Sequence, residues 1–191
     1  MSISVRETGL IGVLEIQPQC HGDERGSFCE VWSAEDFARH GIRTQFVQDN
    51  HSVSRQRGVM RGMHYQLAPF AQDKLVRVLR GAIFDVAADI RPGSPTFGRW
   101  IGVELSASRW NQLLVPAGYA HGFVTLEPDT EVAYKVSRPY SRAHERAIRF
   151  DDPRLAIAWP VRVEEMQLSD KDRLAPMLDV ADLTAISEVP A

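Results

Sequence analysis

Two short segments of the chain carry side chains that could move protons beside a carbonyl group. The first contains Arg61 and His64, and the second begins ten residues after the histidine with Lys74 and includes Arg77. A neutral histidine can remove a proton, and a lysine ammonium can stabilise the negative charge that results. Arginine side chains bind phosphate. The two segments, expected on neighbouring strands, therefore indicate proton chemistry on a phosphorylated carbonyl compound.

Two further side chains fit this chemistry, although each also has an ordinary structural explanation. Tyr134 lies in a strand-like run, where it is either a general acid across the pocket from His64 or a tyrosine at the rim of a sandwich. Asp172 lies in a polar segment typical of a solvated turn. If the fold brings it to His64, it orients the imidazole and stabilises its protonated form. The sequence spacing leaves both interpretations open.

A third cluster lies near the N-terminus, where Arg25 and Gly26 are followed by Phe28 and Glu30. An arginine next to a glycine and an exposed aromatic can hold a phosphate and stack against a base. The same residues also fit an ordinary surface turn.

Short β-strands are the elements that must position these residues. Runs of β-branched and aromatic residues recur between turn signals, which favours an all-β sandwich or jelly roll over βαβ units. The expected strands cover residues 13–16, 44–48, 74–79, 82–90, 100–105, 112–115, 122–126 and 131–136. A short helix is expected at 33–40, capped by Ser33 and ended by Gly41, and a second at 180–187.

Composition limits the class of protein. The 191 residues predict one domain over 1–191, with the segment from about 150 to 191 packed across the sandwich. A net charge of −3 gives no support to nucleic-acid binding, and no apolar run approaches the length of a membrane span. The N-terminus shows no signal-peptide pattern, and Cys20 and Cys29 are expected to be reduced thiols, which together predict a cytoplasmic protein.

The segment 116–123, with its proline, glycine and His121, resembles the second motif of the cupin superfamily. Metal-binding cupins carry two histidines and a glutamate in their first motif, but here Gln66 stands two residues after His64. Thr125 replaces an asparagine that is frequent four residues after the histidine. Two imidazoles alone make a poor metal site, which favours a metal-free cupin. A metal-binding cupin remains the alternative.

Taken together, the motifs resemble the dTDP-4-dehydrorhamnose 3,5-epimerase family. They occur in order from about residue 10 to 180, so the resemblance covers nearly the whole chain. The matching segments are 22–26, 48–52, 61–66, 74–77, 94–98, 116–123, 134–135, 159–160 and 168–172.

The resemblance implies a cofactor-independent, metal-free cupin jelly roll with one or two short helices. It implies a homodimer that exchanges N-terminal strands and shares its pockets between subunits. The implied reaction inverts C3 and C5 of dTDP-4-dehydro-6-deoxy-glucose to give dTDP-4-dehydro-rhamnose, in the biosynthesis of dTDP-L-rhamnose for polysaccharide.

The resemblance also assigns roles. His64 corresponds to the catalytic base, Asp172 to its orienting partner, Tyr134 to the acid on the opposite face and Lys74 to the group beside the enolate oxygen at C4. The implied substrate-binding residues are Arg25, Phe28, Glu30, Gln48, Asp49, Asn50, Arg61, Gln72, His121, Tyr140, Glu145 and Lys171.

Three positions depart from the family pattern. His21, Ser27 and Cys29 stand where large aromatic residues are frequent, which leaves the nucleotide specificity open. Two other functions remain: a single-site epimerase that inverts only C3 or C5, and a non-catalytic metal-binding cupin such as a small-ligand sensor.

Overall fold

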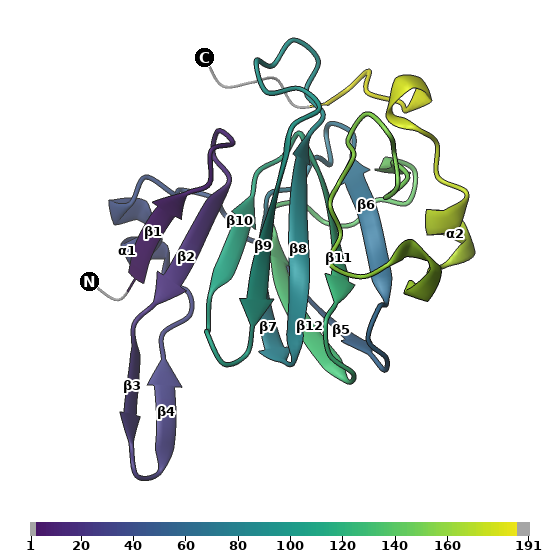
Figure 1. Cartoon of the computed structure of the whole chain (residues 1–191). Helices are drawn as coiled ribbons and strands as arrows, with labels where there is room; N and C mark the ends of the chain where they lie inside the picture. Colours follow the sequence, from purple (N-terminus) through teal and green to yellow (C-terminus); the bar gives the residue numbers. More distant parts are fainter. Residues whose placement is uncertain (1–2, 187–191) are drawn as a thin grey trace.

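Two antiparallel β-sheets, packed face to face, form the body of the computed structural model, which describes residues 3–186 (Figure 1). The strands of the larger sheet are, in spatial order, β1 (Ile3–Glu7), β2 (Leu14–Pro18), β10 (Gln112–Val115), β7 (Lys74–Arg80), β12 (Thr130–Val136) and β5 (Gln48–Ser54). Those of the smaller sheet are β13 (Glu145–Ala147), β6 (Met60–Gln66), β11 (Tyr119–Thr125), β8 (Ala82–Asp89) and β9 (Trp100–Ser106). The expected all-β, cupin-type sandwich is confirmed.

Apolar side chains that alternate along the strands fill three layers of core. Between the sheets lie residues such as Val76, Ile83, Leu113 and Val132. The outer face of the five-stranded sheet is covered by the segment that follows β13, whose buried members are Leu155, Val161, Met166 and Leu178. The outer face of the six-stranded sheet packs against Phe37 and Ile42. Both faces of each sheet are therefore partly covered by apolar side chains.

The short helices agree only in part with the sequence. Helix α1 (Ala34–Arg39) begins as expected, because the Ser33 side chain accepts a hydrogen bond from the Asp36 amide. Later in the chain follow the single-turn elements η1 (Val163–Glu165), α2 (Asp170–Arg173) and η2 (Leu178–Val180). Within the described residues no helix is long and apolar enough to cross a membrane.

The expected helix at 180–187 is wrong for residues 181–186, and residue 187 lies outside the described part of the chain. Here the backbone bonds to other segments instead of to itself. The Tyr65 hydroxyl donates to the Asp182 carbonyl, and the Ala68 amide donates to the Ala185 carbonyl. These tertiary contacts replace the bonds within a helix, and tertiary context overrides a weak local propensity.

The strand expected at 44–48 begins later than predicted, because β5 starts at Gln48. Its outward side chains Asp49 and His51 are exposed, and the inward side chains Asn50 and Ser52 are polar as well, which makes the strand polar in sequence. Only the side facing the other sheet is shielded, so the usual apolar signal of a strand is weak here.

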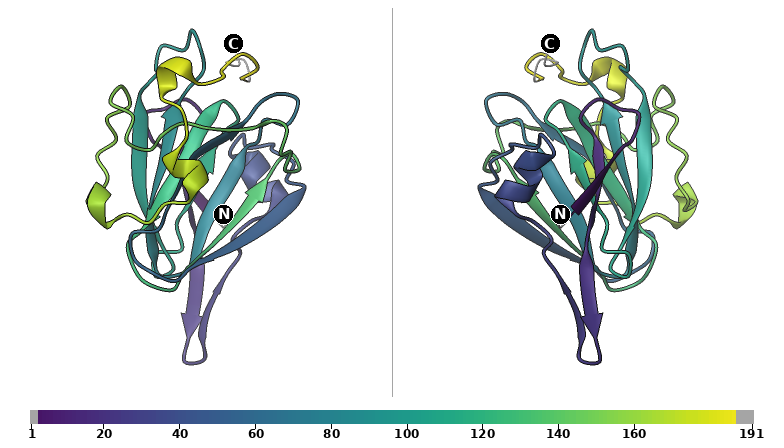
Figure 2. Two further views of the ribbon diagram at one scale, coloured as in Figure 1. Left: turned by 90° about the vertical axis from the view of Figure 1, so that its right-hand side faces the viewer. Right: turned by 90° about the vertical axis from the view of Figure 1, so that its left-hand side faces the viewer.

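A hairpin of β3 (Cys20–Asp23) and β4 (Gly26–Cys29) projects from the body (Figures 1 and 2). The expectation of two reduced thiols is wrong, since Cys20 and Cys29 oppose each other across the hairpin and form a disulfide. Opposed cysteines on paired strands meet the distance that a disulfide requires, with 4.4 Å between their Cα atoms. The cytoplasmic location loses the support that free thiols gave it and stays a prediction.

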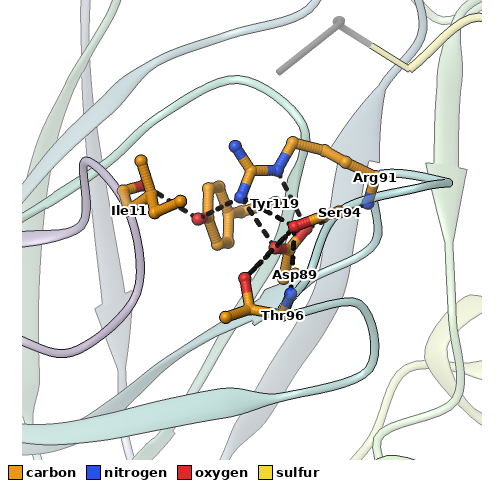
Figure 3. A network of polar contacts seen from close by, with 6 residues as sticks. All are labelled: Ile11, Asp89, Arg91, Ser94, Thr96 and Tyr119. Atoms are coloured by element: carbon orange, nitrogen blue, oxygen red, sulfur yellow. Dashed lines mark hydrogen bonds and ion pairs between the residues drawn. The ribbon is translucent and has the colours of Figure 1, made fainter. Parts of the chain in front are cut away.

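A buried polar network ties one end of the sandwich together (Figure 3). Arg91 donates to both carboxylate oxygens of Asp89, at 2.9 and 2.7 Å, and Ser94 and Thr96 donate to the same carboxylate. Arg91 also donates to the Tyr119 hydroxyl, which in turn donates to the carbonyl of Ile11. The network joins β8, the loop after it, the start of β11 and an N-terminal loop. It thereby fixes the strand that carries His121.

We expect Arg91→Met to lower the free energy of unfolding by about 3–5 kcal/mol, because it leaves the Asp89 carboxylate buried without its countercharge. Asp89 is fully buried and Arg91 is 3% exposed, so solvent cannot compensate. Urea denaturation followed by circular dichroism measures the loss. A change below about 1 kcal/mol would mean that the ion pair contributes no more than an exposed one.

Candidate active site

A cavity of about 440 Å³ opens between the two sheets, a size that suits a small-molecule ligand. Seven of the residues predicted for catalysis or binding line it: Arg61, His64, Lys74, His121, Tyr134, Lys171 and Asp172. They come from β6, β7, β11, β12 and α2, and only the fold brings them together.

His64 and Lys74 lie on strands of facing sheets, so the expectation of neighbouring strands is wrong. β6 belongs to the five-stranded sheet and β7 to the six-stranded sheet. Each side chain lines the cavity from its own sheet, and the Lys74 ammonium donates to the His64 carbonyl at 3.3 Å. The cavity is therefore bounded by groups from both layers.

An irregularity in β6 directs both Arg61 and His64 into the cavity. In a regular strand, residues three apart point to opposite faces. Here the register against β11 shifts, since His121 pairs with His64 while Phe123 pairs with Arg61. Such a bulge re-aims side chains, and both residues consequently face the same space.

Gly62 makes this irregularity possible. Its φ of +132° lies in the region that side chains rarely adopt, and an added Cβ would lie 2.5 Å from the Gly122 Cα. We expect Gly62→Ala to destabilise the protein by about 1–3 kcal/mol and to displace His64, since the two backbones would have to separate. Thermal unfolding and a crystal structure of the variant test this expectation. An unchanged unfolding temperature and an unmoved His64 would contradict it.

His64 and Asp172 form a close pair that the sequence could not establish. Asp172 lies on the short helix α2, and its Oδ1 is 2.5 Å from His64 Nε2. Burial tends to raise the pKa of the Asp172 carboxyl, but the hydrogen bonds from His64 and Ser169 outweigh it and the pKa lies below its ordinary value. An ionised Asp172 orients the ring and leaves the other ring nitrogen able to accept a proton.

Lys74 and Tyr134 complete the wall opposite His64. Burial lowers the pKa of Lys74 to about 8, although Asp85 and Glu145 oppose the shift. Burial also raises the pKa of Tyr134, so its phenol keeps its proton at neutral pH. The wall therefore presents a cation and a neutral proton donor.

The rim of the cavity is held by a chain of polar contacts. Glu145 forms an ion pair with Lys171 and accepts a hydrogen bond from the Tyr140 hydroxyl at 2.9 Å. The Gln48 side-chain amide donates through Nε2 to Asn50 Oδ1, and Gln48 Oε1 accepts a hydrogen bond from the Tyr140 backbone amide. Five of the predicted binding residues are thus connected beside the cavity.

Two relevant groups were missed by the sequence analysis. Asp85 does not line the cavity but contacts a residue that does, since its Oδ1 lies 2.8 Å from His121 Nε2. Ser52 lines the cavity, and its hydroxyl is buried without a partner among the described residues. The available signal for Asp85 was a charged residue within the apolar run of β8, four residues before a second one at Asp89.

Gln66 and Thr125, the two positions at which the sequence departs from metal-binding cupins, have their side chains engaged elsewhere. The Gln66 amide donates to the carbonyls of Phe70 and Pro139 and accepts from the Ser141 amide. Thr125 donates to the carbonyl of Gln56 and accepts from the Val59 amide. Over residues 3–186, no three histidine, cysteine, aspartate or glutamate side chains gather closely enough to bind a metal ion.

Comparisons with known proteins agree with this arrangement. Residues 7–179 match the model of the dTDP-4-dehydrorhamnose 3,5-epimerase family. A protein of that name from Sinorhizobium fredii is 49% identical over 177 residues, which is 93% of this chain and 88% of its relative. The chain belongs to the dTDP-4-dehydrorhamnose 3,5-epimerase family. The expected resemblance is confirmed.

Solved members of the family have the same fold. The 3,5-epimerase RmlC of Legionella pneumophila, solved in complex with dTDP-4-keto-L-rhamnose, superposes with a TM-score of 0.93 at 44% identity and covers 99% of this chain and 100% of its own. ChmJ of Streptomyces bikiniensis, a 3′-monoepimerase solved with dTDP-quinovose, has a TM-score of 0.84 at 38% identity, covering 90% and 86%. The fold is thus shared by double and single epimerases.

Several residues predicted for this epimerase site lie away from the cavity. Arg25, Phe28 and Glu30 belong to the projecting hairpin or follow it, and Arg25 pairs with Asp23 instead. Asp49 lies on the outer face of its sheet and pairs with Lys135, and the Gln72 amide donates to the Arg138 carbonyl. Arg77, like Asp49, lines a separate outer hollow. The chain therefore brings His64, Lys74, Tyr134 and Asp172 to one cavity without the hairpin residues.

Proposed function

We propose that this protein is a dTDP-4-dehydrorhamnose 3,5-epimerase that inverts C3 and C5 of dTDP-4-dehydro-6-deoxy-glucose, within dTDP-L-rhamnose biosynthesis. The observation that carries the proposal is the His64–Asp172 pair, which faces the same cavity as Tyr134 and Lys74. Such a set supplies a base from one sheet, and an acid and a cation from the facing sheet.

The proposed reaction uses the acidity that the C4 ketone gives to its neighbouring carbons. His64 removes the hydrogen of C3 or C5 as a proton, and Asp172 stabilises the imidazolium that forms. Negative charge moves to the C4 oxygen, where the Lys74 ammonium stabilises the enolate. Tyr134 then gives a proton to the opposite face of the carbon, which inverts the centre. The ketone is itself the electron sink, so the residues suffice for the chemistry.

The cations of the cavity support the choice of a nucleotide-linked substrate. Arg61 and Lys171 line the same space as His64. We propose that they bind the diphosphate, for which arginine provides paired donors and lysine a point charge. His121 would then meet the sugar at the inner end of the cavity. The exposed Tyr140 ring, next to the Glu145–Lys171 pair, would contact the nucleotide end.

We further propose a homodimer in which the hairpin of one subunit completes the cavity of the other. The hairpin projects from the body of its own chain (Figure 2). Phe28 is 72% exposed, and none of Arg25, Phe28 and Glu30 lines the cavity of its own chain. Since β2 pairs with β10 of the same chain, we propose the β3–β4 hairpin as the exchanged element. Binding residues from both subunits would then meet in each pocket.

Complementation between two inactive variants tests the shared pocket. Arg25→Ala would impair the hairpin, and His64→Asn would impair the base. Co-expressed with different tags and purified as a mixed dimer, they should regain activity, because one pocket receives both native residues. Light scattering of the wild-type protein should give the mass of two chains. A monomer, or a mixed dimer as inactive as its parents, would reject the proposal.

A single-site epimerase is the second candidate function, and the similarity of the chain to the 3′-monoepimerase ChmJ supports it. Incubation with dTDP-4-dehydro-6-deoxy-glucose in D₂O, followed by NMR, separates the two. Deuterium at both C3 and C5 supports the double epimerase, and deuterium at one carbon supports the single-site enzyme. Absence of exchange, with an active control epimerase alongside, would reject both.

A further inference from the structure

We propose that Asp85 is a positioning residue of the active site, whose buried negative charge keeps Lys74 protonated and holds His121 in one tautomer. The inference deepens the proposed function and rests on it for the catalytic part. Asp85 itself does not line the cavity and is not assigned to touch substrate.

Asp85 occupies an unusual place for a carboxylate. It lies on β8 with Ile83 and Ala87 of the central core on the same face of the strand, and its exposed fraction is 0%. Its Oδ1 bonds to His121 Nε2 at 2.8 Å, while its Oδ2 has no hydrogen-bond partner among the described residues. An incompletely bonded carboxylate at such a site is costly unless a nearby charge compensates for it.

A second buried carboxylate on the same strand, that of Asp89, has hydrogen-bond partners for both of its oxygens. Asp89 is also fully buried and lies four residues further along the same face, but Arg91, Ser94 and Thr96 satisfy its oxygens. Asp85 has no comparable cage. We assign its compensation to charge. His121, to which Asp85 is bonded, lines the same cavity as Lys74 of the facing sheet, and the Asp85 carboxylate raises the pKa of that lysine.

The charged surroundings of Lys74 make this interaction matter. Carboxylates that belong to this part of the site are Asp85 of β8, Glu145 of β13 and Asp172 of α2. The cations are Arg61 of β6 and Lys171 of α2. The other titratable groups are His64 of β6, His121 of β11 and Tyr134 of β12. Burial lowers the pKa of Lys74 to about 8, and Asp85 is the foremost of the groups that oppose this shift. Without Asp85 the ammonium would lose its proton at a lower pH.

The same carboxylate determines how His121 meets the cavity. Burial lowers the pKa of His121, so the ring is neutral at pH 7. The nitrogen that faces Asp85 must then carry the proton, since a carboxylate accepts hydrogen bonds. The other nitrogen is left as an acceptor, suited to a sugar hydroxyl.

Direct titration of the lysine tests the electrostatic part without substrate. The chain has three lysines, Lys74, Lys135 and Lys171, so protein labelled with ¹³C at the lysine Cε gives three resonances, assigned from Lys→Arg variants. We expect Lys74 of the wild type to titrate near 8 and that of Asp85→Asn at least about one pH unit lower. The Lys135 signal, from a side chain on the outer face, should behave identically in the wild type and in Asp85→Asn.

Activity provides the second readout. For the wild type, kcat should fall as the pH rises through about 8, because the protonated form of Lys74 is the active one. In Asp85→Asn this fall of kcat, the alkaline limb of the pH profile, should occur at a lower pH, by the same amount as the Lys74 titration. KM should change less than about threefold. A wild type that is inactive on the dTDP-sugar would reject the proposed function, but the lysine titration would still decide the role of Asp85.

Asp89→Asn is the matched control, because it also neutralises a fully buried carboxylate on β8. We expect it to lower the unfolding temperature and to leave both the Lys74 titration and the alkaline limb in place. An unshifted Lys74 in Asp85→Asn, or an equal shift in Asp89→Asn, would overturn the proposal.

Discussion

Replacing His64 by asparagine should lower kcat by about 10²–10⁴-fold, the contribution typical of a positioned base. Asparagine can still donate a hydrogen bond to Asp172, so the buried carboxylate keeps a partner. The asparagine amide, however, cannot accept a proton from carbon. Binding should survive, because the cations that we assign to the diphosphate are untouched. The chemical step is therefore lost while affinity remains.

Steady-state kinetics and calorimetric titration with dTDP measure the two effects separately. Exchange of the C3 and C5 hydrogens in D₂O should fall with kcat, since both begin with the same proton transfer. His40→Asn is a suitable control, because His40 caps helix α1 and lies outside the cavity lining. A fully active His64→Asn protein would refute the assignment of the base, and loss of dTDP binding would point to a structural role.

The chemistry of the site was more accessible from sequence than its geometry. His64 and Lys74 were selected by residue type and by strand-like surroundings, and both line the cavity. Their placement on facing sheets was not accessible, because local patterns identify strands but not the sheet to which each belongs. The turn between β6 and β7 carries the chain from one layer to the other, which only the full topology reveals.

Contacts between distant segments escaped the sequence for a related reason. Asp172 lies 108 positions beyond His64 and reaches it because α2, capped by Ser169, packs beside β6. Asp85 was hidden within an apolar strand, where a charged residue carries no periodic signal. The disulfide was not predicted, because two cysteines in a sequence of this composition carry no disulfide signal, and only the register of the hairpin places Cys20 opposite Cys29.

The β3–β4 hairpin carries predicted binding residues that lie away from the cavity of the same chain. Sequence resemblance gives binding roles to Arg25, Phe28 and Glu30, but none of them lines the cavity of its own subunit. These three residues therefore either act outside the cavity or enter the cavity of a second copy of the chain. The complementation experiment distinguishes these possibilities because it asks whether the missing group can be supplied in trans.

Tyr134→Phe should separate proton removal from inversion. With the phenol absent, His64 can still take a proton from C3 or C5 and return a solvent-derived one to the same face. We therefore expect the rate of inversion to fall by about 10²–10⁴-fold, while hydrogen exchange in the recovered starting sugar falls much less. NMR of the sugar in D₂O reports both rates in one sample.

The matched control for this variant is Tyr65→Phe, which removes a buried hydroxyl that donates to the Asp182 backbone carbonyl, on the far side of the smaller sheet from the cavity. It should lose some stability and keep its inversion rate. If Tyr134→Phe inverts its substrate at the wild-type rate, the acid must be another group or water. If exchange and inversion fall together, Tyr134 acts before the proton returns, as a donor to the developing enolate. Only exchange without inversion places a base on one face of the sugar and the phenol on the other, which is the arrangement that two facing sheets can provide.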